Sequence, residues 1–546
     1  MMLRSRRKLR IIAADELYLP MKKFHPFLLS LLSGILLFAA WPVSPFTFLI
    51  FIAFIPLLWL ERQGSRRFFG WVYIAMVTWN VAATWWVWNA SAPGAIGAFL
   101  ANSLLMCLPW IGFRAVRRRM GDGIGYASLV VFWLSFEYIH LQDWGLSWPW
   151  LTVGNVFAAR TSWVQWYEYT GTSGGGLWVF VVNVLLFLLV WDWVQKRKLV
   201  KRRVWWLVGL LLAPLAISLM MGIHMKMPVE TPGNVVIVQP NIDPYEKIST
   251  GSFDAQLGKL LRLSESAVDS NTVLLVWPET ALYNDYGFRE DRLKGNYFLN
   301  PLWDFLRRHP HLNLLTGVES VRIFKDKHSA TAVRIPDTTE YVESYNAAIL
   351  MDSSGPLTFY HKSKLVPGVE TLPFFLHFLD SWFEKFGGTT AGYTGQDERT
   401  ILNETNHSYR IAPVVCFESI YGEFVSLYVR DGADVIAIIT NDGWWGDTPG
   451  YHQHESYARL RAIETRRWVV RSANTGVSCI IDPWGSITES RPWAQAATIK
   501  AAVQATQGRT FYVRYGDCIS KIALVLAALF ICWHLFTVIK TRTSRG

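Results

Sequence analysis

Three side chains with different reactive groups stand in the middle of the chain, each where a short apolar, β-like run ends. They are the carboxylate of Glu279, the ammonium of Lys362 and the thiol of Cys416. A base, a cation and a thiol are the components of covalent catalysis by cysteine. A chain that served only as a membrane scaffold would not need them. The set therefore predicts a thiol acyl-transfer enzyme.

The chemistry needs all three groups together. A free cysteine thiol has a pKa of about 8.5, so an adjacent base or cation must help to form the thiolate. Charges about 4 Å apart interact by roughly 4 kcal/mol at an effective dielectric of about 20, enough to shift a proton equilibrium. Taken singly, Cys416 is typical of a small buried hydrophobe, Glu279 of a helix N-terminus and Lys362 of a solvated surface. Their order and context favour catalysis.

The composition indicates a membrane protein. Hydrophobic residues make up 51% of the chain, with 28 Trp and 32 Phe, which is more apolar surface than one soluble core uses. The formal net charge is +11, but the basic residues form short clusters between apolar runs, so nucleic acid is not expected as a partner. The 5 cysteines have no paired spacing, and neither a disulfide nor a zinc framework is indicated.

Apolar stretches of roughly 15 to 21 residues approach the length that a helix needs to cross a bilayer. Seven precede residue 224 and an eighth lies near the C-terminus, so about eight transmembrane helices are expected. The stretches are 24–41, 46–60, 68–88, 95–113, 124–142, 174–194, 203–223 and 518–539.

Basic clusters give an orientation. They follow the second, fourth and sixth stretches, at 62–67, 114–119 and 196–203, whereas the intervening loops carry almost no Lys or Arg. By the positive-inside rule these clusters are cytoplasmic, and seven spans then place 224–517 on the opposite side.

The N-terminal residues 1–23 are expected to form a basic cytoplasmic leader. Met21 followed by Lys22-Lys23 resembles a natural start, so 1–20 could be a start-site artefact. The stretch 24–41 could instead be a cleaved signal peptide, but the alternation of loop charge favours its retention.

The region 230–512 is predicted to be a separate α/β domain, between a seven-helix domain at 24–223 and a last helix at 518–540. Continuous apolar runs predict strands covered on both faces. Amphipathic helices are expected between them. The strands are expected at 235–239, 273–277, 313–316, 347–351, 411–415 and 435–439, and the helices at 252–268, 299–309 and 450–468.

In that order, Trp277-Pro278-Glu279, Tyr360-His361-Lys362 and Cys416-Phe417-Glu418 resemble the Glu-Lys-Cys triad of the nitrilase superfamily. The wider pattern resembles the apolipoprotein N-acyltransferases of the bacterial envelope. Further similar segments are Val238-Gln239-Pro-Asn241-Ile242, Tyr345-Asn346, Asn441–Asp447, His454, Trp148-Pro149-Trp150-Leu151 and Gly171-Thr-Ser-Gly174. The resemblance extends over nearly the whole chain, from about 24 to 540.

This resemblance implies an α-β-β-α sandwich on the periplasmic side of a multi-pass protein of the bacterial inner membrane. It implies transfer of a fatty acyl chain from a phospholipid to the α-amine of the diacylglyceryl-cysteine of an apolipoprotein, without cofactor or metal, by a monomer. Cys416 would form the thioester, Glu279 would be the base and then the acid, and Lys362 would stabilise the oxyanion with the backbone N–H after Cys416.

Other residues receive roles from the same resemblance. Glu370, Glu418 and Phe417 would support the triad. The residues expected to bind substrate are Trp277, Tyr345, Asn346, Trp444 and Trp445. The family usually has Gly directly before the first supporting glutamate, whereas this chain has Gly368-Val369-Glu370, so the turn that presents Glu370 must differ.

Several alternatives remain open. The aromatic segment 372–388 is expected to form a lid over the site, since transfer to an amine must exclude water, but a plain core helix would look similar.

His452 and His454 could suggest a metal, yet an i, i+2 spacing puts them on different faces of a helix. Gly171–Gly176 lacks the Lys-Ser/Thr of a phosphate loop and indicates close helix approach or a bend. Rival functions are a membrane-tethered nitrilase-type amidohydrolase and a non-catalytic assembly or transport protein.

Overall fold

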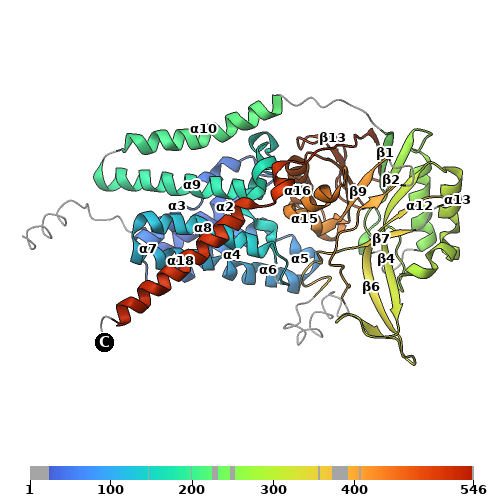
Figure 1. The fold of residues 1–546 in the computed structure, drawn as a ribbon, viewed down its shortest axis with the longest axis horizontal. Coiled ribbons are helices and arrows are strands. Elements are labelled where there is room, and N and C mark those ends of the chain that lie inside the picture. The colour runs from blue at the N-terminus through green and yellow to red at the C-terminus, as the bar shows by residue number, and fades with distance from the viewer. Residues whose placement is uncertain are drawn as a thin grey trace, which may run out of the picture.

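A bundle of long helices and a pair of β-sheets lie end to end in this protein (Figure 1). The structure is a computed structural model, and it describes residues 24–543 except 146, 198, 224–231, 246–251, 355–356, 372–391 and 405–407. The expected leader at 1–23 and the expected lid at 372–388 lie outside the described residues.

The helical part is built from the segments before residue 224 and from the last helix. Four helical stretches of the described chain have the length and apolar composition to cross a bilayer, namely Ala92–Met120, Tyr167–Gln195, Lys201–Ile223 and Cys518–Lys540. The helices are α2 (Pro26–Ala40), α3 (Ile55–Arg62), α4 (Phe68–Thr84), α5 (Val87–Ala90), α6 (Ala92–Leu105), α7 (Cys107–Met120), α8 (Asp122–His140), α9 (Tyr167–Lys196), α10 (Lys201–Ile223) and α18 (Cys518–Thr543).

One expected span is wrong as a continuous helix. The stretch 46–60 is divided into the 3₁₀ helix η1 (Thr47–Phe51) and α3. Asn183 of α9 satisfies the backbone at the break, because its amide accepts from the Phe54 N–H at 2.9 Å and donates to the Ile50 carbonyl at 2.9 Å. A polar side chain can thus replace the missing helical hydrogen bonds at membrane depth.

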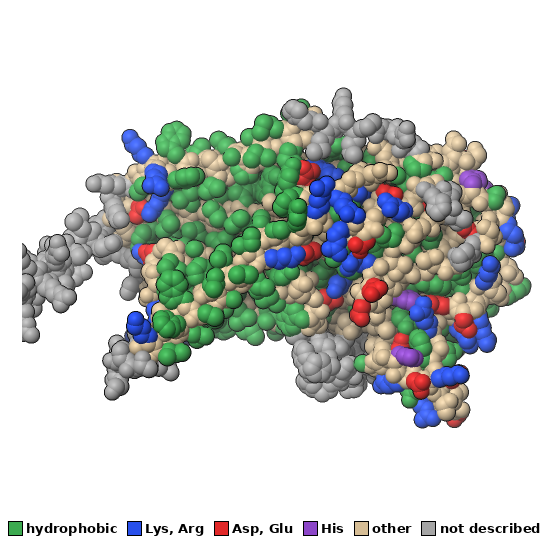
Figure 2. All heavy atoms as spheres, in the orientation of Figure 1, with side chains coloured by type: hydrophobic (Ala, Val, Ile, Leu, Met, Phe, Trp, Pro, Cys, Tyr) green, Lys and Arg blue, Asp and Glu red, His purple; other side chains and the backbone are tan. Residues whose placement is uncertain are grey.

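The outer helices present apolar side chains to the surroundings, and Figure 2 shows the hydrophobic surface that they form. Trp205 of α10 is 74% exposed and Phe536 of α18 is 63% exposed. Such a surface suits acyl chains rather than water. Ion pairs gather at the bundle end remote from the sheets, where Arg117 meets Glu61 at 2.6 Å and Arg62 meets Asp122 at 2.6 Å.

The glycine-rich start of α9 bends and packs closely, as predicted. Gly171 has φ +61° and interrupts the helix, a conformation that glycine adopts without a steric penalty. A Cβ on Gly154 would lie 1.9 Å from the Thr172 carbonyl oxygen, and one on Gly175 would lie 1.9 Å from the Tyr167 hydroxyl. These glycines allow α9 to touch the 3₁₀ helix η3 (Val153–Phe157) backbone to backbone.

Two sheets form the other part. The first has the order β14-β1-β2-β4-β6-β5, with β3 beside β4 and β7 beside β6, and the second has the order β13-β12-β11-β10-β9-β8. The strands are β1 (Asn234–Gln239), β2 (Thr272–Val276), β3 (Phe288–Arg289), β4 (Asn313–Phe324), β5 (Val333–Arg334), β6 (Tyr341–Met351), β7 (Thr358–His361), β8 (Leu402–Asn403), β9 (Arg410–Val415), β10 (Val435–Thr440), β11 (Trp468–Ala473), β12 (Ser478–Ile481), β13 (Ile487–Arg491) and β14 (Ala497–Ala502). All six predicted strands are present.

Helices cover both outer faces of the paired sheets. The two sheets contact each other through β1 with β11 and β6 with β9. Helices α12 (Phe253–Glu265) and α13 (Asn300–Arg308) lie on one side, and α15 (Gly422–Asp431) and α16 (Pro449–Thr465) on the other (Figure 1). The three predicted helices correspond to α12, α13 and α16. The result is a four-layered α-β-β-α domain.

Helix α16 joins this domain to the membrane part. The Trp41 indole donates to the Tyr457 hydroxyl at 3.1 Å, and the Trp150 indole donates to Gln453 at 2.7 Å. Gln453 in turn donates to the Ala83 carbonyl at 3.1 Å. These bonds are buried, so the two parts are held in one orientation.

We expect Gly154→Ala to destabilise the protein by about 1–3 kcal/mol, because the new methyl group would collide with backbone that cannot yield. The apparent melting temperature of the detergent-solubilised chain measures this. Gly209→Ala in α10, where a Cβ meets nothing within 4 Å, is the matched control and should not lower stability. Equal melting temperatures would contradict the close contact.

Candidate active site

The three reactive side chains predicted from the sequence stand at strand ends of the two facing sheets. Strands β9, β10 and β11 are parallel, so their carboxyl ends lie at one edge. Cys416 directly follows β9, Lys362 directly follows β7, and Glu279 comes three residues after the end of β2. Side chains at such an edge converge on one cavity.

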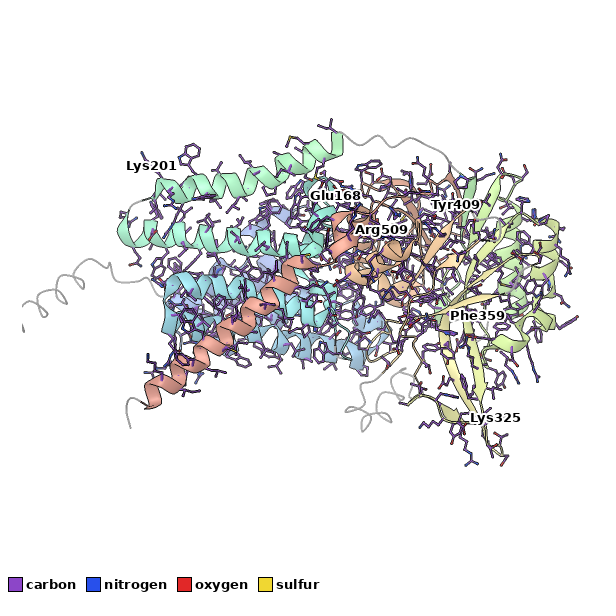
Figure 3. The ribbon with its side chains drawn as sticks, in the orientation of Figure 1. Glu168, Lys201, Lys325, Phe359, Tyr409 and Arg509 are labelled. Carbon is purple, nitrogen blue, oxygen red and sulfur yellow. The ribbon has the colours of Figure 1, made fainter. Side chains whose placement is uncertain are left out.

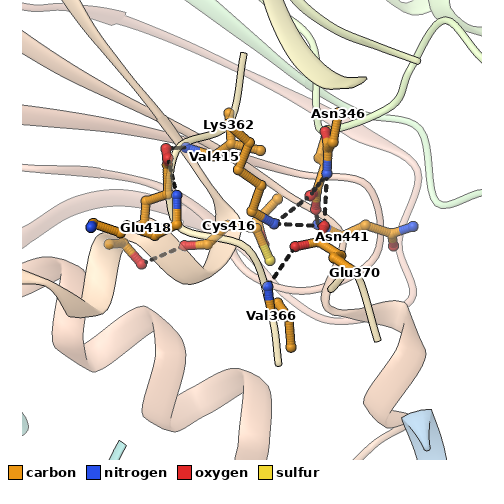
Figure 4. A network of polar contacts seen from close by, with 12 residues as sticks. Asn346, Lys362, Val366, Glu370, Val415, Cys416, Glu418 and Asn441 are labelled. Atoms are coloured by element: carbon orange, nitrogen blue, oxygen red, sulfur yellow. Dashed lines mark hydrogen bonds and ion pairs between the residues drawn. The ribbon is translucent and has the colours of Figure 1, made fainter. Parts of the chain in front are cut away.

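Lys362 is the centre of the site (Figure 4). It is 1% exposed, and its ammonium donates to Glu370 at 2.9 Å and to Glu279 at 3.4 Å. The Asn346 amide donates to the same two carboxylates, at 2.8 Å to Glu279 and 3.0 Å to Glu370. The Asn441 backbone N–H adds a bond to Glu279 at 3.0 Å. The Glu279 carboxylate is thereby held from three sides.

The surroundings set the charge of the lysine and the thiol. Burial by itself lowers the pKa of Lys362, but Glu370 and Glu279 outweigh it, so the pKa lies above its usual range and the ammonium persists. Burial, aided by the Glu279 charge, raises the pKa of Cys416 against the opposing effect of Lys362. The raised pKa favours the protonated thiol in the resting site.

The thiol is presented on a strained turn, with its sulfur directed toward the Lys362 ammonium (Figure 4). Cys416 has φ +51°, a left-handed conformation that is uncommon outside glycine, and it opens the 3₁₀ helix η8 (Cys416–Ile420). Such strain costs about 1–3 kcal/mol and persists when the surroundings enforce it.

Glu418 connects the turn at Cys416 with the loop that follows Lys362. It is fully buried and accepts from the backbone N–H groups of Val415 at 2.8 Å and Ser363 at 2.7 Å, and from the Tyr360 hydroxyl. Burial raises the pKa of Glu418 to about 7, although these donors oppose the shift. One carboxylate therefore connects the ends of β7 and β9.

Glu370 reaches the site through a turn at Gly368. Gly368 has φ +79°, and its N–H donates to the Thr371 carbonyl at 2.8 Å. The second oxygen of Glu370 accepts from the Val366 N–H at 2.8 Å. The turn places this carboxylate beside Lys362.

Two of the expected substrate-binding residues point away from the thiol. Successive side chains of a strand face opposite sides. Asn346 faces the second sheet and the site, whereas Tyr345 faces the other side, with its hydroxyl on Glu343 and its ring 4.1 Å from His361. Trp277 is fully buried against α12, where its indole donates to Ser264 at 2.9 Å.

The remaining aromatic residues of the expected set border the membrane part. Phe417 stacks on Trp148 at 5.9 Å. Trp445, in the 3₁₀ helix η9 (Asp442–Trp445), packs on Trp86 at 4.7 Å, and Trp444 packs on Tyr245 at 5.3 Å. The wall of the site is therefore aromatic where it meets the helices.

A buried polar network beneath the nucleophile contains residues whose roles the sequence did not reveal. His454 contacts the Cys416 carbonyl oxygen at 3.1 Å and Ser419 at 2.9 Å with one ring nitrogen, and Asp442 at 2.9 Å with the other. Arg471 donates to Asp442 at 2.7 Å. Despite burial, Arg471 and His454 lower the pKa of Asp442 to about 2. In the sequence, the available signal for this network was Arg471, a charged residue inside the mostly apolar run 468–473.

The histidines do not gather metal ligands. Across the described residues no group of three His, Cys, Asp or Glu side chains could hold a metal ion. His454 is fully buried with both nitrogens occupied by the network, while His452 lies on the exposed side of α16.

Substitution of His454 by Ala should slow alkylation of Cys416 roughly fivefold, because the carbonyl of the strained turn loses a buried partner worth about 1 kcal/mol and the turn relaxes. Mass spectrometry of the Cys416 peptide after treatment with a thiol reagent measures the rate. His452→Ala, on the same helix, is the control and should leave the rate unchanged. Equal rates in the two variants would exclude this positioning role.

The comparisons with known proteins agree with this arrangement. The family models for carbon-nitrogen hydrolase and for the apolipoprotein N-acyltransferase N-terminal domain match residues 234–511 and 33–185. An apolipoprotein N-acyltransferase of Chlorobaculum tepidum is 32% identical over 92% of this chain and 95% of its own length. That of Azotobacter vinelandii is 31% identical over 82% of this chain and 80% of its own length. That of Geobacter metallireducens is 28% identical over 92% of this chain and 95% of its own length. With a thiol, an ammonium and a carboxylate assembled at its sheet edge, the chain belongs to the apolipoprotein N-acyltransferases, membrane acyltransferases that carry a carbon-nitrogen hydrolase domain.

Proposed function

We propose that the chain transfers a fatty acyl group from a membrane phospholipid, through a thioester on Cys416, to the N-terminal amine of diacylglyceryl-cysteine in an apolipoprotein. The observation that carries this proposal is the burial of thiol, ammonium and carboxylate together at the seam with the membrane helices. Cys416 is 9%, Lys362 1% and Glu279 6% exposed. A site that excludes water protects a thioester from hydrolysis and leaves it for an amine.

In the first step the sulfur of Cys416 attacks the ester carbonyl of the phospholipid while Glu279 takes the thiol proton. The C–S bond forms, and the tetrahedral oxyanion receives hydrogen bonds from Lys362 and from the backbone N–H of Phe417. The ester C–O bond then breaks, and Glu279 returns the proton to the departing alkoxide of the lysophospholipid.

In the second step the amine of the lipoprotein attacks the thioester carbonyl. Glu279 accepts a proton from the amine, the C–N bond forms, and the C–S bond breaks. Cys416 leaves as a thiolate and recovers the proton from Glu279, so that the enzyme returns to its starting state. Lys362 serves both oxyanions from one position, because its contacts with Glu370 and Glu279 hold it there.

We place the protein in the bacterial inner membrane with about eight spans and the catalytic domain in the periplasm. The support is the concentration of basic side chains at the opposite end of the helix bundle, around Arg62 and Arg117. We further propose that the protein acts as a monomer.

A phospholipid with a labelled acyl chain should leave label on the wild-type chain and none on Cys416→Ala. Intact-protein mass spectrometry, with release of the label by hydroxylamine, identifies the thioester. Cys479→Ala, which removes another buried thiol, is the matched control and should keep the label. Hydrolysis of small amides without label would favour a nitrilase-type amidohydrolase, and full lipoprotein acylation by Cys416→Ser would contradict the thioester.

Glu279→Gln should lower the rate of thioester formation by about 10²–10⁴, because the amide keeps much of the carboxylate's shape but cannot accept the thiol proton. Single-turnover acylation with labelled phospholipid gives the rate. Glu340→Gln, an exposed glutamate of the same domain, should behave as wild type. A change of less than tenfold in Glu279→Gln would remove this residue from the role of base.

A further inference from the structure

A cavity of about 500 Å³ lies outside the catalytic site, where α9 begins and the chain enters α18 through the short helix α17 (Phe511–Tyr515). Arg466 and Arg467, which precede the amino end of β11, form one wall. Cys416 follows the carboxyl end of β9. Strands β9 and β11 are both parallel to β10, so the cavity and the thiol lie at opposite ends of the second sheet. Figure 3 labels Glu168 and Arg509 at this junction.

The cavity is strongly cationic. Four arginines, namely Arg466, Arg467, Arg509 and Arg514, face one glutamate, Glu168, among the described residues that line it. Figure 2 shows Lys and Arg side chains gathered where the hydrophobic belt meets the sheet domain. Like charges crowded in this way favour a bound anion.

The four arginines differ in how their guanidinium groups are occupied. The guanidinium of Arg466 is paired with Glu168, and that of Arg467 donates to the carbonyls of Ala433 and Gly508. Arg509 and Arg514 are exposed, and within the described part of the chain neither side chain makes a hydrogen bond or ion pair. Their donors are free for an oxyanion, which arginine binds with two N–H groups.

Exposed aromatic rings border these charges. Tyr169, Phe511 and Tyr515 are 52%, 44% and 59% exposed. Their rings form a row, with 6.5 Å between Tyr169 and Phe511 and 4.6 Å between Phe511 and Tyr515. Aromatic rings at the end of a spanning helix lie at the level of lipid headgroups. An anion site beside such a row suits a molecule with both a phosphate and acyl chains.

We propose that this arginine pocket binds the headgroup of an anionic phospholipid in the leaflet next to the sheet domain, as a second lipid site separate from the thiol. Arg509 and Arg514 hold the phosphate, and the row of Tyr169, Phe511 and Tyr515 contacts the glycerol and upper acyl chains. A soluble phosphate would use the arginines but not the rings. The site goes beyond the acyl-transfer reaction and does not depend on its mechanism.

Native mass spectrometry of the full chain in detergent tests the proposal, with phosphatidylglycerol and phosphatidylcholine of the same chains as probes. The wild type should retain phosphatidylglycerol in preference. Arg509→Gln combined with Arg514→Gln should weaken that lipid roughly tenfold and leave phosphatidylcholine unchanged. Arg292→Gln combined with Lys294→Gln removes the same charge from exposed positions elsewhere and should keep the wild-type preference.

A second variant covers the case in which the arginine variant does not fold. Phe511→Ala combined with Tyr515→Ala should also weaken phosphatidylglycerol, while thioester formation at Cys416 with excess donor continues in both variants. Equal retention of the two lipids by the wild type, or wild-type retention by both variants, would overturn the proposal. Displacement of phosphatidylglycerol by an equal concentration of glycerol phosphate would overturn it as well, by identifying a site for a soluble anion.

Discussion

A single ammonium, taken almost wholly out of water, is the constraint on which the catalytic domain depends. Removing a charge from water costs several kcal/mol, and it is tolerated when partners surround it. Lys362 has Glu370 and Glu279 as partners, and Asn346 holds both carboxylates from the other side. These residues come from four separate segments of the first sheet and the loop after β7, so the ion cluster forms once β2, β6 and β7 are assembled in that sheet. The reactive groups are organised by the same contacts that satisfy the buried charge.

The turn that carries the Cys416 thiol is held by two buried side chains, His454 and Glu418. His454 meets the carbonyl of Cys416, and Glu418 takes the N–H before it. Each of the two is itself held by buried partners, Asp442 for the histidine and Tyr360 for the glutamate. A non-glycine residue with positive φ can persist in this setting, because the network on either side enforces the conformation.

Much of this arrangement was predictable from sequence, since reactive residues at the ends of apolar runs indicate strand ends on one edge. That reasoning identified Glu279, Lys362 and Cys416 as neighbours. It did not reveal that Trp277 and Tyr345 face away from the thiol, because membership of a motif says nothing about which face of a strand a side chain takes. Both lie on the face covered by α12 and α13, although each is close in sequence to a residue of the site.

Features that depend on distant partners were beyond local patterns. The stretch 46–60 reads as one apolar helix, and the amide that supports its break comes from Asn183, far along the chain. The packing of Trp86 on Trp445 and the role of Arg471 likewise arise from contacts between remote segments. Periodicity and composition carry no information about such pairs.

The bonds that tie α16 to Trp41, Trp150 and Ala83 have a geometric consequence. They fix the height of the Cys416 sulfur above the helix bundle. For the phospholipid donor proposed above, the ester carbonyl would therefore have to rise to that height, with the acyl chains still partly among the helices. Under that proposal the anchoring would select acyl donors by how far their carbonyl group can be lifted from the membrane.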